Sequence, residues 1–438
     1  GVIAKILDVE KKLVKKYVTE AFEDKGKKIL NKNYEALNKG YEISKNLITE
    51  KSITCSLTKD QEIAEYILYN GAETVGMGAI AGGCNFICSY PMSPSTGVLV
   101  FLANHSHEFD ILVEQAEDEI AAINSGLGAF YAGGRSMITT SGGGLALMGE
   151  GISLSGMTET PIVMHVAQRP GPATGLPTQT EQGDLELVMH SGHGFFPRII
   201  LAPGTLEEAF YLTQKAFNLA DKYQVPVIVL TDQFLMDLHY NFPKLSLENL
   251  EIINHVVTTA KDYQRYKYTK NGISPRGIPG NGKGLVRADS DEHDQDGFIT
   301  EDLDTTRIKM VEKRRKKFQT IQEDTIPPTL IGEEEYSILL VGWGSVFPAV
   351  TEALGELQKE EVSFLHFSQV FPLPEEAEKY LKQADKIVLI ENNSSGQFGK
   401  HLQKYIGIKP NHEILKYNGM PFSVEELIEN ISTIMEEH

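Results

Sequence analysis

The chain has 438 residues, enough for two or three domains. Apolar residues make up 41% and charged residues 23%, the usual balance for a chain that buries a globular core. The formal net charge of −19 argues against nucleic acid as a partner, because phosphate binding requires clustered Lys and Arg. No run of residues is long and apolar enough to span a bilayer, so we expect no membrane partner either.

The cysteines are few and odd in number, namely Cys55, Cys84 and Cys88. This count is typical of a reduced intracellular compartment, and we expect a cytoplasmic protein. Cys84 and Cys88 supply too few thiolates for an iron–sulfur cluster or a structural zinc, so we interpret them as small buried hydrophobes. The chain begins at Gly1 without a signal segment, and we expect it to be a piece of a longer one.

The first 242 residues divide into three parts. Residues 1–40 are charged and have helical apolar spacing, and residues 41–60 are polar and irregular, which predicts a linker. From 61 to 242, short apolar runs alternate with helical stretches such as Leu206–Leu219, which predicts a doubly wound parallel sheet with helices on both faces. The predicted strands are Asn85–Ser89, Phe109–Val113, Ser136–Thr140, Pro161–Val166, Arg198–Leu201 and Pro226–Leu230.

The rest of the chain contains an irregular stretch and a second α/β pattern. Residues 243–332 are rich in Gly and Pro and include the basic cluster Lys313–Lys317, for which we expect a solvated or salt-bridged helix face. Strand-like runs then return at Tyr336–Val341, Val362–Phe367 and Lys386–Ile390. We therefore predict domain boundaries at 1–60, 61–242, 243–332 and 333–438, with 243–332 as a connector.

Three short motifs match known sites only in part. Gly277–Gly284 follows the P-loop pattern, but Gly284 replaces the required Ser or Thr and no strand precedes it, so we predict a plain loop. Gly76–Ala81 partly matches a dinucleotide fingerprint, but close helix packing explains its glycines better. Glu292–Gly297 resembles half an EF-hand loop, yet position twelve is Leu303; we expect a solvated acidic loop and leave a weak cation contact open.

A carboxylate cluster, Glu117–Glu119, lies between the predicted strands Phe109–Val113 and Ser136–Thr140. The helix that it opens has a face of small residues, which lets a backbone or a flat ligand approach closely. Those residues are Ala121, Ala122, Ser125, Gly126, Gly128, Ala129 and Ala132. A carboxylate at a helix N-terminus is also favoured by the helix dipole, which explains the cluster without any ligand.

Two other polar groups follow predicted strands of the same domain. The prolines of Tyr90–Thr96 stiffen that turn and aim the Ser93 hydroxyl at the C-terminal edge of the sheet, where ligands bind in open α/β folds. Arg169 follows Pro161–Val166 and can bind a carboxylate through two parallel hydrogen bonds. The simpler alternatives are a stiff loop in which Ser95 or Thr96 caps the next helix, and a surface arginine.

These motifs, taken in order, resemble the alpha subunits of 2-oxoacid:ferredoxin oxidoreductases, most of all the 2-oxoglutarate type. The resemblance runs from about residue 62 to the C-terminus. The matching segments are Tyr90–Ser95, Glu117–Ala122, Thr140–Gly144, Met157–Pro161, Gln168–Thr178, Ser274–Arg276, Pro279-Gly280, Glu292–Asp294, Lys309–Arg314, Val341–Ser345 and Lys416–Gly419. Residues 1–42 resemble the end of the gamma domain that some members carry fused ahead of alpha, so most of that domain would be absent.

The resemblance implies an α/β thiamine diphosphate-binding domain of the pyrimidine type, a doubly wound parallel sheet, followed by a transketolase C-terminal-like α/β domain. Glu119 matches the catalytic glutamate that hydrogen-bonds the pyrimidine ring, and Pro91 matches a cofactor-binding position. Ser93 and Arg169 match positions that bind the 2-oxo-carboxylate end of the substrate, although the family usually has Thr in place of Ser93.

The resemblance also implies partners. A beta subunit would share the thiamine diphosphate and hold its diphosphate, the magnesium and an iron–sulfur cluster. The chain lacks a Gly-Asp-Gly motif with a downstream Asn, the usual diphosphate and magnesium holder, which fits an incomplete catalytic half. Coenzyme A would take the acyl group and ferredoxin the electrons, so we expect a hetero-oligomer, inactive as this chain alone.

Three other functions stay open at this point. They are a thiamine-dependent 2-oxoacid dehydrogenase component that uses lipoamide, a P-loop nucleotide-binding protein that uses Lys283, and a non-catalytic scaffold subunit. Among substrates we favour 2-oxoglutarate, then branched-chain 2-oxoacids, then pyruvate. The physiological direction of the reaction also stays open.

Overall fold

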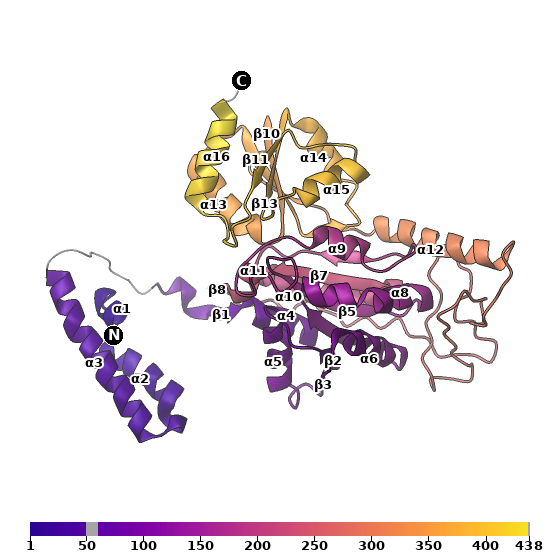
Figure 1. Ribbon diagram of the computed structural model, residues 1–438, viewed down its shortest axis with the longest axis horizontal. Coiled ribbons are helices and arrows are strands. Elements are labelled where there is room, and N and C mark those ends of the chain that lie inside the picture. The colour runs from indigo at the N-terminus through magenta and orange to yellow at the C-terminus, as the bar shows by residue number, and fades with distance from the viewer. Residues whose placement is uncertain (50–59, 437–438) are drawn as a thin grey trace. The chain divides into compact units, whose positions relative to one another are not determined.

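The computed structural model describes residues 1–49 and 60–436, and the contacts divide the chain into two compact units, Gly1–Tyr66 and Ile67–His438. In its described part, residues 1–49 and 60–65, the first unit contains helices (Figure 1). They are α1 (Val2–Ile6), α2 (Lys11–Phe22), η1 (Glu23–Lys25), α3 (Lys27–Thr49) and η2 (Glu62–Glu65). The helical prediction for residues 1–40 is confirmed.

The predicted linker at 41–60 is wrong over its first part, because α3 continues to Thr49. Tyr41 and Ser44 hold that stretch in place: the Tyr41 hydroxyl donates to the Val9 carbonyl at 2.9 Å, and the buried Ser44 hydroxyl donates to the Gly40 carbonyl at 2.7 Å. The rest of the linker up to residue 59, Cys55 included, lies outside the described residues.

The second unit contains a seven-stranded sheet in the order β12-β6-β7-β5-β4-β2-β3 (Figure 1). All pairs among β2 to β7 are parallel. The strand β12, from the C-terminal part of the chain, pairs antiparallel with β6. Every residue of the central strands β5 and β7 is buried, as expected for a parallel sheet covered on both faces. The strands are β2 (Phe86–Ser89), β3 (Leu112–Gln115), β4 (Ser136–Thr140), β5 (Ile162–Gln168), β6 (Ile199–Leu201), β7 (Pro226–Asp232) and β12 (Gln369–Phe371).

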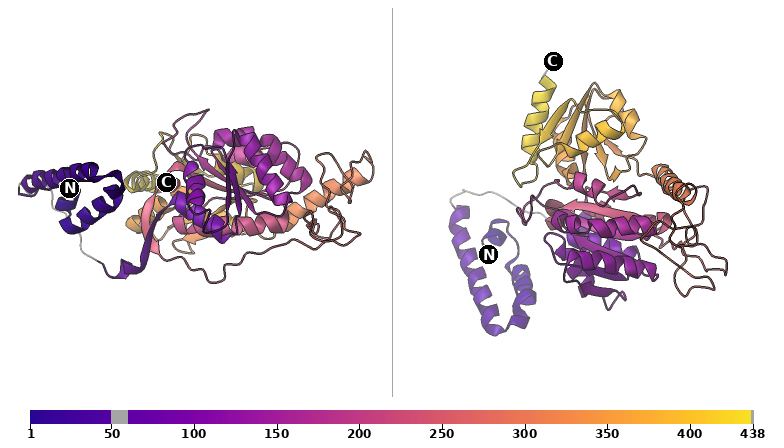
Figure 2. Two further views of the ribbon diagram at one scale, coloured as in Figure 1. Left: turned by 90° about the horizontal axis from the view of Figure 1, so that it is seen from below. Right: turned by 45° about the vertical axis from the view of Figure 1, so that its right-hand side comes forward.

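Helices cover this sheet in two groups (Figure 2). One group packs α4 (Gly71–Ala81) against α5 (Thr96–Asn104) and α10 (Leu206–Tyr223). The other packs α6 (Glu119–Tyr131) with α7 (Gly142–Leu147) and α8 (Gly149–Thr158). The short helices α9 (Leu185–His190) and α11 (Gln233–Asp237) follow β5 and β7. The predicted doubly wound α/β fold is confirmed.

Glycines allow the close approach of α4 to its neighbours. A Cβ at Gly76 would overlap the Phe101 ring, and one at Gly78 would overlap the Phe210 carbonyl. The interpretation of these glycines as helix packing is therefore confirmed. Cys84 and Cys88 are buried free thiols, also as predicted, and desolvation raises the pKa of Cys84 to about 12, which disfavours the reactive thiolate.

One predicted strand in this sheet begins too early. Phe109–Val113 was expected, but β3 starts at Leu112. The Phe109 amide still donates to the His105 carbonyl in the turn after α5, and Asp110 has a left-handed backbone with φ of +53°. An extended strand cannot pass through that conformation, so it begins only beyond it.

The strand β8 (His239–Pro243), which pairs with β1 (Tyr66–Asn70), leads into the connector, and the connector contains α12 (Thr306–Gln322). Gly277–Gly284 lies in irregular chain with no strand leading into it, so the plain-loop prediction is confirmed. Glu292 of the half EF-hand pattern accepts from the Arg314 guanidinium at 3.2 and 3.1 Å. It is paired with arginine, and the solvated loop predicted there is wrong at this residue.

The basic cluster on α12 is not a solvated face, which corrects one of our two expectations. Lys313 and Lys317 are both buried, and both donate to the carboxylate of buried Glu159 at the end of α8. Opposite charges within the interior lower the pKa of Glu159 well below its ordinary value. The salt-bridged alternative is therefore confirmed, and it fastens α12 to the sheet domain.

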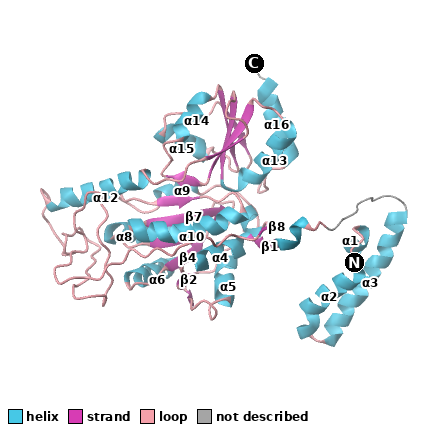
Figure 3. Ribbon diagram, turned by 180° about the vertical axis from the view of Figure 1, so that it is seen from behind, coloured by secondary structure: helices cyan, strands magenta, loops and turns pink. Residues whose placement is uncertain are grey.

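The C-terminal part forms a five-stranded sheet in the order β14-β13-β10-β11-β9, parallel except for β9. Figure 3 shows helices beside the magenta strands of this part. Its elements are β9 (Thr329–Ile331), β10 (Ile338–Trp343), η3 (Gly344–Val346), α13 (Phe347–Leu357), β11 (Val362–Phe367), α14 (Ala377–Gln383), β13 (Lys386–Glu391), α15 (Gln397–Tyr405), β14 (His412–Leu415) and α16 (Val424–Glu436). No helix in the ranges 1–49 and 60–436 combines the length and apolar character needed to cross a bilayer.

Candidate functional site

The site lies at the C-terminal edge of the seven-stranded sheet. Because β2, β4, β5 and β7 are parallel, the segments that follow them meet at one edge, where open α/β sheets bind ligands. Those segments carry Ser93 after β2, Ser141 after β4 and Arg169 after β5. Glu119 follows the neighbouring edge strand β3.

Glu119 is the first residue of α6 and is buried, with 4% of its surface exposed. The preceding Asp118 caps the helix, since its Oδ1 accepts from the Ala121 amide at 2.8 Å. Glu119 is thereby free of the capping role. Its Oε1 is fully buried and has no hydrogen-bond partner among the described residues. Buried carboxylate oxygens are normally satisfied, so this atom is suited to a bond with a ligand.

A glycine keeps the space beside Glu119 open. A Cβ on Gly144 would lie 2.8 Å from Glu119 Cγ and Oε1 and would overlap Thr140 Oγ1. The neighbouring Ser141 hydroxyl is a second buried polar group without a partner in the part of the chain that the structure describes. The edge between β4 and α7 thus combines two unsatisfied polar atoms with a backbone that carries no side chain.

The structure brings Arg169 and Ser93 into contact. Arg169 Nη1 donates to the Ser93 backbone carbonyl at 2.6 Å, so the bond uses the main chain and not the hydroxyl. Ser93 is exposed and Arg169 is half-buried. Ser95 occupies the N-cap position of α5, but its hydroxyl donates to the Met92 carbonyl at 2.7 Å and closes the turn. Pro91 lies in the same turn, half-buried. The functions of these residues stay predictions.

Two carboxylates that the sequence analysis missed belong to the same edge. A Cβ on Gly142 would overlap the Asp184 carboxylate, and the Asp184 amide donates to Gln168 Oε1 at 2.9 Å, beside Arg169. Burial, together with the nearby charge of Glu181, raises the pKa of Asp184 to about 6 against the lowering effect of Arg169. Burial also raises the pKa of Glu181. Nothing in the spacing of the sequence indicated that this segment returns to the edge.

The C-terminal domain holds that segment through Gln182. The Gln182 amide and side-chain Nε2 donate to the carbonyls of Asn392 and Trp343 at 2.7 and 2.8 Å. Its side-chain oxygen accepts from the Asn392 amide at 2.9 Å, and its backbone carbonyl accepts from Asn393 Nδ2 at 2.9 Å. The C-terminal domain therefore supplies hydrogen-bond partners for all four polar groups of the buried Gln182.

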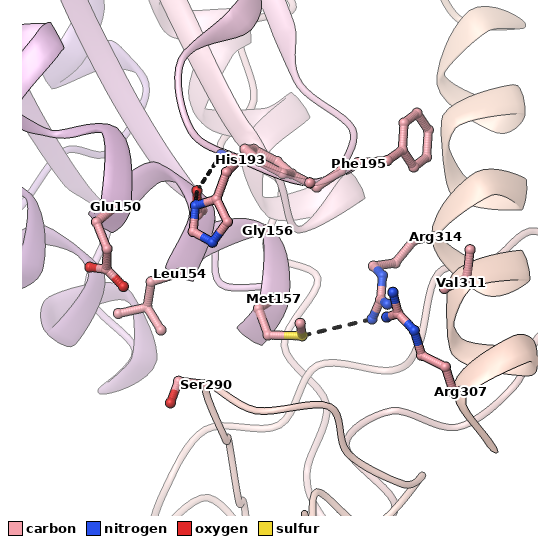
Figure 4. Close-up of a pocket in the computed structure, with 13 residues that line it drawn as sticks. Glu150, Leu154, Gly156, Met157, His193, Phe195, Ser290, Arg307, Val311 and Arg314 are labelled. Atoms are coloured by element: carbon pink, nitrogen blue, oxygen red, sulfur yellow. Dashed lines mark hydrogen bonds between the residues drawn. The ribbon is translucent and has the colours of Figure 1, made fainter. Parts of the chain in front are cut away.

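A separate cavity of about 250 Å³ lies between α8 and α12 (Figure 4). His193 Nδ1 and Ser153 Oγ are 3.0 Å apart at one side of it. At the other side Arg314 contacts Met157 Sδ at 3.9 Å, while Glu292 neutralises its charge. None of the predicted site residues lines this cavity, so we place the candidate site at the strand edge.

The fold and the site define a thiamine diphosphate-binding α/β domain. Residues 77–313 match the family described as pyruvate flavodoxin/ferredoxin oxidoreductase, thiamine diP-bdg. The buried, unpartnered Glu119 oxygen and the open backbone at Gly144 fit such a cofactor.

Three relatives make the assignment more specific. The 2-oxoacid:ferredoxin oxidoreductase subunit alpha of Saccharolobus solfataricus is 37% identical over 85% of this chain and 62% of its own length. The 2-oxoglutarate synthase subunit KorA of Archaeoglobus fulgidus is 34% identical over 78% of this chain and 91% of its own. A solved structure of 2-oxoglutarate:ferredoxin oxidoreductase from Magnetococcus marinus, with 2-oxoglutarate, coenzyme A and succinyl-CoA bound, superposes with a TM-score of 0.90 at 32% identity. That match covers 99% of this chain and 76% of the other.

The chain belongs to the family of 2-oxoacid:ferredoxin oxidoreductase alpha subunits. It spans about three fifths of the length of the first curated relatives that it matches.

Proposed function

We propose that this chain is the alpha subunit of an enzyme that decarboxylates a 2-oxoacid oxidatively, transfers the acyl group to coenzyme A and passes the electrons to ferredoxin. The observation that carries the proposal is the buried Glu119 carboxylate, whose Oε1 has no partner among the described residues and faces the open backbone of Gly144. The match to a thiamine diphosphate-binding family supports thiamine diphosphate as the ligand of that oxygen.

Glu119 would hold the aminopyrimidine ring by a hydrogen bond to a ring nitrogen. A bond of this kind is strong where water is excluded, and Glu119 is 4% exposed. Pro91, in the turn after β2, would contact the same cofactor. When bound, thiamine diphosphate supplies an electron sink for the carbon that loses carbon dioxide.

Arg169 and Ser93 would bind the carboxylate next to the 2-oxo group. A guanidinium matches a carboxylate in shape and charge, and the 2.6 Å bond to the Ser93 carbonyl fixes its orientation at the sheet edge. We favour 2-oxoglutarate as the substrate. The similarity to KorA subunits and to a structure that contains 2-oxoglutarate and succinyl-CoA supports this choice.

The chain would act with a beta subunit in the cytoplasm. That subunit would bind the diphosphate and its magnesium and carry the iron–sulfur cluster, because this chain has no Gly-Asp-Gly motif with a downstream Asn. The irregular backbone around Lys283 argues against the alternative of a P-loop nucleotide-binding protein.

The test is an anaerobic assay of this chain, produced as its full-length native protein together with its beta partner. Coenzyme A-dependent viologen reduction would be followed with 2-oxoglutarate, 2-oxoisovalerate and pyruvate in parallel. We expect the highest kcat/KM with 2-oxoglutarate. A complex that contains cofactor and cluster but reduces viologen with none of the three would refute the proposal. Dependence on lipoamide in place of viologen or ferredoxin would favour a dehydrogenase component.

A further inference from the structure

The inference concerns His165, a buried histidine in the middle of β5 to which the proposed reaction gives no role. His165 lies opposite Thr139 of β4 in the register of the sheet, and its Nδ1 is 2.7 Å from the Thr139 hydroxyl. Its Nε2 is 2.8 Å from the hydroxyl of Thr231 on β7, the neighbouring strand on the other side. All three side chains are buried, so polar contacts join three adjacent parallel strands away from water.

Stability alone does not explain a histidine at this position. Met164 and Val166, on either side of it in β5, are buried and apolar. Burying a polar group costs free energy, and an apolar set of the same shape is often as stable as a buried hydrogen-bonded pair. Desolvation lowers the pKa of His165 to about 3, so the imidazole is neutral and has one donor and one acceptor nitrogen. What the hydrogen bonds add is a defined geometry.

The contacts of Thr139 determine which ring nitrogen carries the proton. Thr139 Oγ1 donates to the Ser95 carbonyl at 3.4 Å. A hydroxyl has a single proton, so Thr139 Oγ1 must accept from His165, and Nδ1 is the protonated nitrogen. Nε2 then accepts from the Thr231 hydroxyl. This arrangement satisfies all three contacts, whereas a proton on Nε2 would leave the Ser95 carbonyl without the Thr139 donor.

Thr139 holds both ends of the Ser93 turn, the segment Ser89–Ser95. At the start of the turn, the Thr139 amide donates to Ser89 Oγ at 2.8 Å. At its end, the Thr139 hydroxyl donates to the Ser95 carbonyl. Between these two bonds, the Ser93 carbonyl accepts from Arg169 Nη1 at 2.6 Å. The turn is therefore fixed at both ends by Thr139 and in the middle by Arg169.

We propose that His165 is a positioning residue of the substrate site: its Nδ1–H orients the Thr139 hydroxyl toward the Ser93 turn and thereby sets the place of Ser93 relative to Arg169. The inference rests on the proposed substrate-binding function of Ser93 and Arg169. It goes beyond that function because it names a buried group, out of reach of the substrate, on which their geometry depends. Loss of this geometry should weaken substrate binding and raise KM more than it changes kcat.

The test compares two replacements of His165 in the complete complex with its beta subunit, with kcat and KM measured for 2-oxoglutarate. The short amide of His165→Asn can donate to Thr139 in place of Nδ1–H, whereas the longer amide of His165→Gln reaches toward Thr231. We expect His165→Gln to raise KM by about three- to tenfold, the usual effect of losing one hydrogen bond. His165→Asn should keep KM within about twofold of the wild type, because the donor to Thr139 remains.

A second pair of variants protects the test against a His165 variant that does not fold. Thr139→Val keeps the branched shape but loses the hydroxyl, so KM should rise by about three- to tenfold, and Thr139→Ser should restore it. Ser136→Ala is the matched control: Ser136 is a buried hydroxyl at the other end of β4, and it donates to the Gly126 carbonyl at 2.6 Å. Its loss should lower stability in urea unfolding without a change in KM.

The outcomes separate this inference from the proposed function. A working wild-type complex in which His165→Gln and Thr139→Val both keep the wild-type KM would overturn the inference alone. An equal rise in KM in Ser136→Ala would also overturn it, because the effect would then reflect general destabilisation of the sheet. A wild-type complex that contains cofactor and cluster but turns over no 2-oxoacid would overturn the proposed function and this inference with it.

Discussion

Three consecutive glycines at the start of α7 allow a sharp test of the site geometry. Gly142, Gly143 and Gly144 all belong to α7, but their Cα atoms face different surroundings. A Cβ on Gly144 would lie 2.8 Å from Glu119 Oε1 and overlap Thr140 Oγ1. A Cβ on Gly143 would lie 4.0 Å from Ala173 O, an ordinary van der Waals distance. A comparison of Gly143→Ala with Gly144→Ala therefore separates the effect of helix propensity on stability from the effect of crowding at the site.

The expected magnitudes follow from two opposing contributions. Replacing Gly by Ala in a helix raises the free energy of unfolding by up to about 1 kcal/mol, and this gain applies to both Gly143 and Gly144. Forcing a methyl group into a packed site costs about 1–3 kcal/mol, and this cost applies only to Gly144, because Thr140 and Glu119 are both buried. Gly143→Ala should raise the free energy of unfolding slightly, and Gly144→Ala should lower it by about 1–2 kcal/mol.

The assay is urea unfolding of the full chain for both variants, together with viologen reduction by Gly144→Ala in the complex with the beta subunit. We expect a difference of about 2 kcal/mol between the two variants and a loss of at least about tenfold in kcat/KM for Gly144→Ala, because the methyl group displaces the Glu119 carboxylate. Equal stability of the two variants, with full activity of Gly144→Ala, would refute the packing that we describe around Glu119.

Three further predictions concern other parts of the structure. Glu159→Gln leaves the Lys313 and Lys317 ammonium groups buried without a counter-charge and should destabilise the chain by about 3–5 kcal/mol in urea unfolding; a loss below 1 kcal/mol would contradict the buried ion cluster. Gln182→Ala removes the partners of two buried backbone groups and should lower the free energy of unfolding by about 1–3 kcal/mol for each group. The midpoint of urea unfolding should therefore move to a lower urea concentration. An unchanged midpoint would be inconsistent with the contact between Gln182 and the C-terminal domain. Arg169→Lys keeps the charge but loses the planar fork, so KM for the 2-oxoacid should rise by about tenfold with a smaller change in kcat; an unaltered KM would remove Arg169 from the substrate site.

Several strands of both sheets could be predicted from the sequence, because strand formation there depends on residues that are neighbours in the chain. The strands at Ser136–Thr140 and Val362–Phe367 have the predicted bounds, since runs of apolar, largely β-branched and aromatic residues end at Gly or polar turn residues. The prediction failed at Phe109, where the apolar pattern continues through a residue with a left-handed backbone. Apolar patterning alone does not report backbone conformation.

Long-range contacts explain the other failures. For the basic cluster on α12, the sequence leaves a solvated and a salt-bridged face open, because the counter-charge, Glu159, is more than 150 positions away in the chain. The same limit concealed Asp184 and Gln182, whose importance depends on contacts with Gly142 and with the C-terminal domain. The sequence places Ser93 and Arg169 at one edge of the sheet because both follow strands of one parallel sheet, and the bond from Arg169 to the Ser93 carbonyl confirms that placement.

The most direct test of the central claim is the comparison of Glu119→Gln with the wild type in the complex with the beta subunit, by coenzyme A-dependent viologen reduction with 2-oxoglutarate. Glu117→Gln, an exposed position in the same cluster, is the control. We predict that Glu119→Gln loses at least about a hundredfold in kcat and that the control keeps its activity, because general acid–base groups contribute about 10²–10⁴-fold. Equal turnover by Glu119→Gln and the wild type would contradict the account.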